Sequence, residues 1–272
     1  MNDHPNRVQR QFEGYFNTHL LWKGKDLMGI NQLNLVTTAL PRFESMKEPN
    51  TRLGKRVEQF VFFELQEHNE IKILLHNTQI QNGKQTVGEI DCILEHNNTT
   101  VHLEIVFKFY LYDANVGETE IEHWIGPNRK DSLIQKLTKL KEKQLPLIFN
   151  PHASSVLLKL GLKPVKITQS VYFKAQLFIP FGKAIPEFKQ LNEACVSGFY
   201  IHYSKIDQFK NCNFLLPNKI DWLQEPQNHL NWATYSTFIE QLMPLIKNET
   251  APLIWIKQPN GQINKYFVVW WT

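Results

Sequence analysis

Apolar and polar residues alternate most regularly between residues 99 and 111. From 101 to 111 every odd position is apolar, whereas the even positions include His102, Glu104 and Lys108. Successive side chains of a strand point to opposite faces, so the pattern predicts a strand over Thr99–Leu111. Its apolar face is expected to lie on the core, and its polar face to carry Glu104 and Lys108.

A second alternating run covers Thr86–Glu95 and places Glu89 and Asp91 on its polar parity. The link between the two runs is rich in Asn, His and Thr, which predicts a hairpin turn. Asp91 and Glu104 then lie side by side on one face of adjacent strands. Two such carboxylates repel each other unless a cation with a preference for oxygen ligands lies between them.

Helical spacing of apolar residues predicts two helices beside these strands. The first begins at Thr51 and carries Glu58 on the flank of its apolar stripe. The second begins at Asn128, with Asp131 in the capping-box position, and continues to about residue 143. The remaining expected elements are the strands Ile71–Leu75, Val171–Pro180 and Phe199–Tyr203, a helix at Phe238–Ile246, and a hairpin of Leu253–Lys257 and Lys265–Trp271 around Asn260-Gly261.

The order helix, three strands, helix, strand predicts an α/β fold with a mixed sheet flanked by helices. Residues 1–50 form an N-terminal lead-in, and residues 51–180 form the α/β core. From residue 181 the chain is rich in prolines, aromatic residues and short apolar runs, so residues 181–272 are expected to form a smaller, strand-rich part. Its final aromatic run packs in a core, stacks on bases or docks a partner.

Charge is concentrated in the second helix. The chain carries a net +4, and residues 129–143 alone contain six basic and two acidic residues. A basic helix beside an acidic metal site suits a polyanion, which makes nucleic acid the expected partner; its alternative role is a solvated helix face. The candidate phosphate contacts are Arg129, Lys136, Lys139 and Lys143. Arg129 has the alternative of packing beside Trp124.

Composition narrows the other classes of function. Three cysteines without a Cys-x-x-Cys pair favour a reducing, cytoplasmic location over a disulfide framework or a zinc finger. No secretory leader is visible, and no apolar run reaches the ~20 residues of a membrane-spanning helix. Neither a Gly-x-Ser-x-Gly elbow nor a phosphate-binding glycine loop is present, which disfavours serine hydrolases and P-loop enzymes.

At this point the chain resembles the PD-(D/E)XK nuclease superfamily, because a helix glutamate precedes Glu-Ile-Asp on one strand and Glu on the next. More narrowly, it is similar to a bacterial family of unknown function placed in that superfamily. The stretches that carry the narrower resemblance are Thr86–Asp91, His102–Leu111, Trp124–Arg129 and Gln144–Leu147. The resemblance implies a restriction-endonuclease-like fold and brings no established activity.

The superfamily resemblance implies a Mg²⁺- or Mn²⁺-dependent phosphodiesterase that hydrolyses DNA or RNA. Asp91, Glu104 and the Ile105 carbonyl would be metal ligands, and Glu58 an outer ligand. Glu58 has the alternative of an exposed helix flank. A lysine would steady the attacking water or the phosphate.

The position of that lysine departs from the superfamily pattern, because Val106 stands where the lysine is expected. Lys108 keeps the correct face but its Cα lies ~13 Å from that of Glu104, against ~7 Å for the usual spacing. Lys108 could instead extend over Tyr110, and Lys136 from the following helix is the other candidate. The alternative to catalysis is a degenerate nuclease fold that binds nucleic acid or a protein partner.

Overall fold

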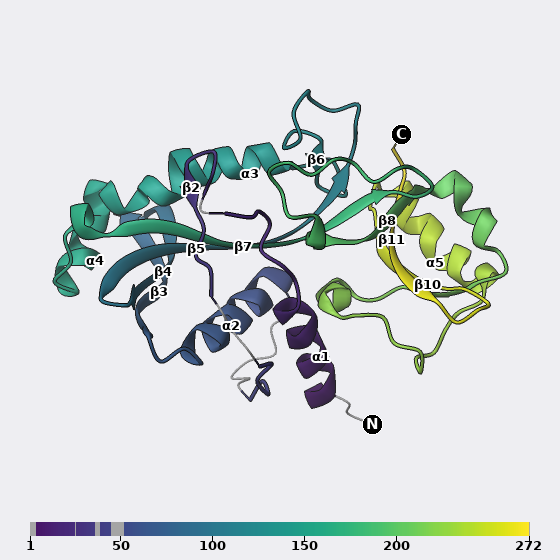
Figure 1. Cartoon of the computed structure of the whole chain (residues 1–272), viewed down its shortest axis with the longest axis horizontal. Helices are drawn as coiled ribbons and strands as arrows, with labels where there is room; N and C mark the ends of the chain where they lie inside the picture. The colour runs from purple at the N-terminus through teal and green to yellow at the C-terminus, as the bar shows by residue number, and fades with distance from the viewer. Residues whose placement is uncertain (1–3, 25, 36–38, 45–51, 272) are drawn as a thin grey trace.

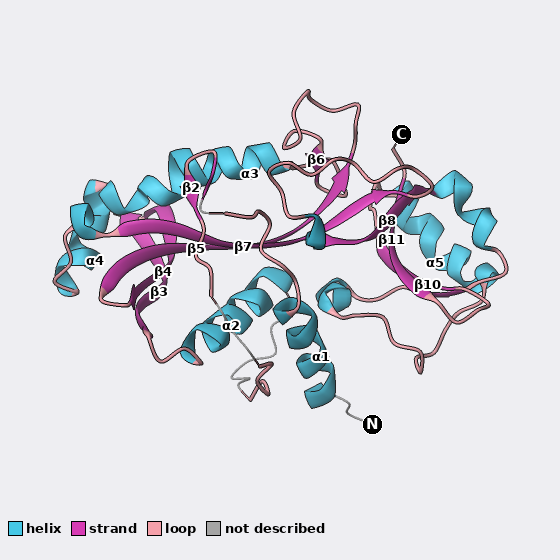
Figure 2. Ribbon diagram, in the orientation of Figure 1, coloured by secondary structure: helices cyan, strands magenta, loops and turns pink. Residues whose placement is uncertain are grey.

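The computed structural model describes residues 4–24, 26–35, 39–44 and 52–271. A nine-stranded mixed sheet runs the length of the molecule, with helices on both of its faces (Figures 1 and 2). The predicted fold class, an α/β mixed sheet flanked by helices, is therefore confirmed. Along the sheet the order is β3-β4-β5-β7-β8-β11-β10-β9, and β6 pairs with β5.

The strands of this sheet are β3 (Ile71–Asn82), β4 (Gln85–His96), β5 (Thr99–Tyr112), β6 (Trp124–Ile125), β7 (Thr168–Pro180), β8 (Val196–His202), β9 (Asn213–Leu215), β10 (Leu253–Lys257) and β11 (Ile263–Val269). A separate small ladder joins β1 (Asp26–Leu27) to β2 (Ile30–Asn31). The α-helices are α1 (His4–Phe16), α2 (Leu53–Gln66), α3 (Leu133–Lys139), α4 (Ser154–Lys159) and α5 (Tyr235–Lys247). None of the helices in the described ranges is long and apolar enough to cross a membrane.

The predicted hairpin of β4 and β5 is present. Their antiparallel ladder runs from Cys92 opposite Leu103 to His96 opposite Thr99. The two-residue turn is Asn97-Asn98, and both residues have positive φ, at 49° and 62°. Asparagine tolerates this left-handed conformation, which gives the turn the twist that joins antiparallel strands tightly.

β5 lies inside the sheet, antiparallel to β4 and parallel to β7. Leu103 packs with α1 and α2 on one face, whereas Val106 and Tyr110 pack with α3 on the other. The predicted apolar face therefore lies on the core, and the face that carries Glu104 and Lys108 is covered as well. A strand covered by helices on both sides buries both faces, so His102 and Glu104 are fully enclosed.

The predicted helix starts need correction. Thr51 lies outside the described residues, and α2 begins at Leu53 with Arg52 as its N-cap. The helix predicted from Asn128 begins at Leu133 instead, and the Ser132 hydroxyl accepts the hydrogen bond from the Gln135 N–H.

A π-helical turn at Leu140–Gln144 follows α3 directly and leads into a 3-10 turn at Leu145–Phe149. Pro146 has no N–H to continue an α-helical ladder, and its ring crowds the carbonyl four residues before it. The wider turn accommodates that loss.

The sheet continues across residue 180, because β7 pairs in parallel with β8 and β8 pairs with β11. The predicted hairpin around Asn260-Gly261 is confirmed as β10 and β11. Gly261 has φ +87°, a conformation that glycine adopts without strain. Helix α5 packs with these C-terminal strands, at the yellow end of Figure 1.

Candidate functional site

Asp91 and Glu104 occupy the point where β4 and β5 separate. The last pair of their ladder is Cys92 with Leu103, and the next two positions are Asp91 and Glu104. Beyond them, none of the described residues of β4 pairs with β5. Among the described strands, the one that pairs with β5 on that side beyond Glu104 is β6, at Leu111 and Tyr112. The two carboxylates therefore lie at the start of an open strand edge.

A local change in strand direction turns Asp91 toward that edge. Ile90 packs with residues that follow α3, whereas Cys92, of the same parity, packs with α1 and α2. Between them, an Asp91 carboxylate oxygen accepts the Ile105 N–H at 2.9 Å. In an extended strand, the N–H and C=O of one residue point to the same side. The Ile105 carbonyl, predicted as a ligand, therefore faces the same edge as Asp91.

The pKa of the Asp91 carboxyl is raised from 3.8 to about 7, mainly by burial and next by the nearby Glu104. The Ile105 N–H and Lys136 oppose this rise, and Glu58 adds to it. A buried acid beside a second buried acid resists ionisation. A cation between them would remove this cost.

Glu104 is fully buried, and both of its oxygens have partners. The His102 Nε2 lies 3.2 Å from one oxygen, and the Gln144 amide donates to the other at 2.5 Å. The Gln144 carbonyl in turn accepts from the Lys136 ammonium at 2.7 Å. Gln144 thus bridges Lys136 and Glu104. Its position depends on the π-helical turn, which the sequence pattern did not reveal.

Of the two candidate lysines, Lys136 interacts electrostatically with the carboxylates of Glu104 and Asp91. The pKa of Lys136 is lowered to about 8, mainly by burial, although Glu104 and Asp91 act in the opposite direction. Lys108 lies 2.5 Å from an Asp131 carboxylate oxygen and is joined to that residue instead. The helix-borne lysine, rather than the one on the strand, therefore accompanies the acid pair.

The other predicted residues are distributed more widely. Glu58 forms an ion pair with Lys55 at 2.7 Å, and the same ammonium reaches Glu89 at 3.4 Å. Arg129 pairs with Asp113 at 2.7 Å and stacks on the Trp271 ring, with 4.7 Å from guanidinium carbon to ring centroid. Its predicted packing partner was Trp124, so this contact differs from the prediction. Lys139 and Lys143 are exposed on α3 and the turn that follows it.

The donor set at the strand edge fits Mg²⁺ or Mn²⁺ better than zinc. Within the described ranges, no group of three or more His, Cys, Asp and Glu side chains is arranged to hold a metal ion. Zinc sites usually use three or four such ligands. Mg²⁺ keeps several waters and is often held by one or two carboxylates with substrate phosphate. Asp91, Glu104 and the Ile105 carbonyl match that requirement, since a carboxylate oxygen has two lone pairs.

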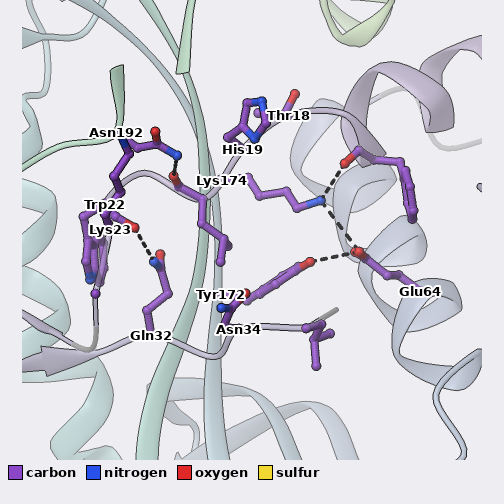
Figure 3. A pocket seen from close by; sticks show the side chains of 14 residues that line it. Thr18, His19, Trp22, Lys23, Gln32, Asn34, Glu64, Tyr172, Lys174 and Asn192 are labelled. Carbon is purple, nitrogen blue, oxygen red and sulfur yellow. Dashed lines mark hydrogen bonds and ion pairs between the residues drawn. The ribbon is translucent and has the colours of Figure 1, made fainter. Parts of the chain in front are cut away.

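A second polar cluster, which the sequence did not suggest, lines a cavity of about 420 Å³ beside β7 (Figure 3). Glu64 from α2 is one of the lining residues and accepts hydrogen bonds from Tyr15 at 2.5 Å and Tyr172 at 2.9 Å. The Lys174 ammonium lies 3.7 Å from Glu64 and donates to the Phe16 carbonyl at 3.0 Å. Burial lowers the pKa of Lys174. Glu64 and Lys174 form an ion pair and hydrogen-bond to their neighbours. These contacts connect α1, α2 and β7.

Comparison with known proteins assigns a family without a function. The model of a family described as a domain of unknown function (DUF1853) matches residues 28–269. No curated protein matches the chain, and no solved structure matches it. The expected membership of a family of unknown function is confirmed, whereas no comparison links the chain to the PD-(D/E)XK superfamily.

Proposed function

We propose that this chain, which belongs to the family described as a domain of unknown function (DUF1853), is a metal-dependent phosphodiesterase acting on DNA or RNA. One observation carries the proposal: the half-buried Asp91 and the fully buried Glu104 are neighbours where two strands separate, with the Lys136 amine connected to Glu104 through Gln144. Two acids placed together with little access to solvent cost stability when both are ionised, so a functional reason for them is favoured. The resemblance to PD-(D/E)XK nucleases supports the same reading.

In this proposal Asp91, Glu104 and the Ile105 carbonyl hold the ion. A bound Mg²⁺ or Mn²⁺ would lower the pKa of water and offset negative charge on the phosphate. Gln144 fixes the orientation of Glu104, and the Lys136 ammonium provides a positive charge for the phosphate. Water attacks phosphorus and gives up a proton to the solvent, the bond from phosphorus to the leaving oxygen breaks, and that oxygen takes up a proton from the solvent.

The first test is calorimetric titration of Mn²⁺ into the wild type, Glu104→Gln and the control Glu240→Gln, whose side chain is exposed on α5. We expect binding by the wild type and the control, and its loss in Glu104→Gln. Cleavage of labelled DNA and RNA with Mg²⁺ then tests catalysis, with Asp91→Asn as the inactive variant. Equal Mn²⁺ binding by Glu104→Gln, or none by the wild type, would contradict the proposed metal site.

A second candidate is a degenerate nuclease fold that binds nucleic acid without cutting it. It is favoured by the hydrogen bonds that already engage both oxygens of Glu104 and by the ion pair between Glu58 and Lys55. Its signature is salt-sensitive binding in EDTA with no cleavage in Mg²⁺ or Mn²⁺.

A further inference from the structure

A cleft of about 580 Å³ opens on β5 beyond the carboxylates. Three consecutive residues of β5, Phe107, Lys108 and Phe109, contribute to its lining. Successive side chains of a strand point to opposite faces of the sheet. A cleft that touches all three therefore lies along the edge of the strand, on the stretch that neither β4 nor β6 covers.

The walls of this cleft come from three distant parts of the chain. The start of α2 lies on one side, the loop before α3 on another, and the 3-10 turn Lys219–Leu223 supplies the third. Helix α2 has 14 residues, and the side chain of its N-cap residue, Arg52, makes no capping hydrogen bond, so the N-terminal N–H groups add positive potential. The same helix carries Glu58, whose charge affects Asp91. Both β5 and α2 therefore connect the cleft to the acid pair.

The cleft is strongly basic. Its charged lining consists of one acid, Asp131, and four basic residues: Arg52, Lys108, Lys130 and Lys219. Apart from Lys108, these basic side chains belong to exposed residues. Such an excess attracts phosphate groups.

Aromatic surface lies next to these charges. Trp222 is half-buried, and its ring packs edge-on against Phe109 and Phe267 at centroid distances of 5.5 and 5.2 Å. The Lys219 ammonium lies 5.5 Å from the Trp222 ring centroid. Basic side chains that follow a backbone, beside aromatic side chains that contact bases, are typical of sites for single-stranded nucleic acid.

We infer that this basic cleft binds an unpaired strand of DNA or RNA and leads it along the open edge of β5 to Asp91 and Glu104. The volume of about 580 Å³ matches sites for ligands of nucleotide size rather than a surface for a duplex. Glu104 and Lys108 are four residues apart, which places their Cα atoms ~13 Å from each other. That the bound nucleic acid runs toward Asp91 and Glu104 rests on the proposed function, whereas its binding in the cleft does not. The C-terminal part of the chain thereby joins the site through Lys219 and Trp222.

Fluorescence anisotropy with a labelled 12-nucleotide oligothymidylate, oligouridylate and a 12-base-pair duplex tests this inference. EDTA is included so that binding does not depend on a metal. The test variant is the double substitution Lys130→Ala and Lys219→Ala. The control is Lys163→Ala with Lys166→Ala, which removes two exposed lysines that follow α4 (Figure 1) and are not among the residues that line the cleft.

We expect the wild type and the control to bind a single strand more tightly than the duplex. The cleft variant should bind the single strand at least ~10-fold more weakly. A plot of the logarithm of the association constant against the logarithm of the salt concentration should become less steep by ~1.4, because two phosphate contacts are lost. Circular dichroism and thermal melting check that the variant is folded.

An unchanged affinity and salt slope in the folded cleft variant would overturn the inference, as would preferred binding of the duplex or no binding of any probe by the wild type. Binding of an extended peptide that competes with the oligonucleotide would instead indicate strand addition to the edge of β5. If Glu104→Gln binds the single strand as tightly as the wild type does, the result supports the cleft as the binding site, whether or not the protein cleaves nucleic acid. Cleavage that is unaffected by the cleft variant would preserve the proposed function and reject this subsite.

Discussion

Asp91→Asn is expected to stabilise the metal-free protein at alkaline pH. In the folded chain the pKa of Asp91 is raised from 3.8 to about 7, with burial as the main cause and Glu104 as the second. The folded state therefore holds the proton more tightly than the unfolded state. The contribution of Asp91 to stability is therefore highest below about pH 4, falls as the pH rises, and levels off above about pH 7.

The size of the effect follows from the two pKa values. At ~1.4 kcal/mol per pKa unit, a rise from 3.8 to about 7 corresponds to ~4 kcal/mol of lost stability at pH 8. By the same relation, ~1.5–2 kcal/mol of the free energy of unfolding is already lost at pH 5, relative to the value below pH 4. Asparagine keeps an acceptor for the Ile105 N–H, and the burial cost of its amide does not depend on pH. The variant should therefore gain ~2–3 kcal/mol over the wild type between pH 5 and pH 8.

Urea unfolding of both proteins in EDTA at the two pH values measures this gain. The substitution Asp207→Asn, at an exposed aspartate, provides the control and should leave the pH dependence unchanged. Parallel changes in stability for the wild type and Asp91→Asn between pH 5 and pH 8 would refute the reasoning. In that case the two acids do not burden the fold, and the physical case for a cation between them is lost.

Three further substitutions test other features of the structure. Glu64→Gln leaves the buried Lys174 without its countercharge and should cost ~3 kcal/mol in urea unfolding; a cost under ~1 kcal/mol would contradict the buried pair. If cleavage is found, Lys136→Met should lower its rate ~100-fold or more while calorimetric Mn²⁺ affinity stays within a few-fold, and an unchanged rate would exclude the lysine. Gly14→Ala would place a Cβ 1.8 Å from the Leu223 carbonyl oxygen, so the melting temperature should fall; helix propensity alone predicts that it rises.

The alternating pattern of the sequence predicted the hairpin that carries the acid pair, because period-two alternation and a turn of two asparagines are local signals. The strand predicted at Ile71–Leu75 extends to Asn82 in the structure. Its second half, from His76 onward, contains mostly polar residues and is largely exposed. Pairing with β4, rather than burial, holds that part of the strand, so no hydrophobic pattern marks it.

The residues that complete the site were less predictable. Gln144 reaches Glu104 only because the helix widens to a π turn before Pro146, and this depends on the balance of a few hydrogen bonds. The choice between Lys108 and Lys136 depended on whether Asp131 would pair with the strand lysine, which is a tertiary contact. Glu64 and Lys174 lie far apart in the sequence, and neither belongs to a motif.

The way the N-terminal segment covers the edge of β7 indicates how far this chain can be shortened and still fold. β8 covers that edge only from Leu177 onward. Before that point the N-terminal segment covers it, with hydrogen bonds from the Leu21 N–H to Phe173 and from the Leu33 N–H to Val171. The family match begins at residue 28, so a protein trimmed to the match would lose the first of these bonds and all of α1. It would uncover the edge of β7 between Phe173 and Gln176, and an uncovered strand edge is the kind of surface on which aggregation begins.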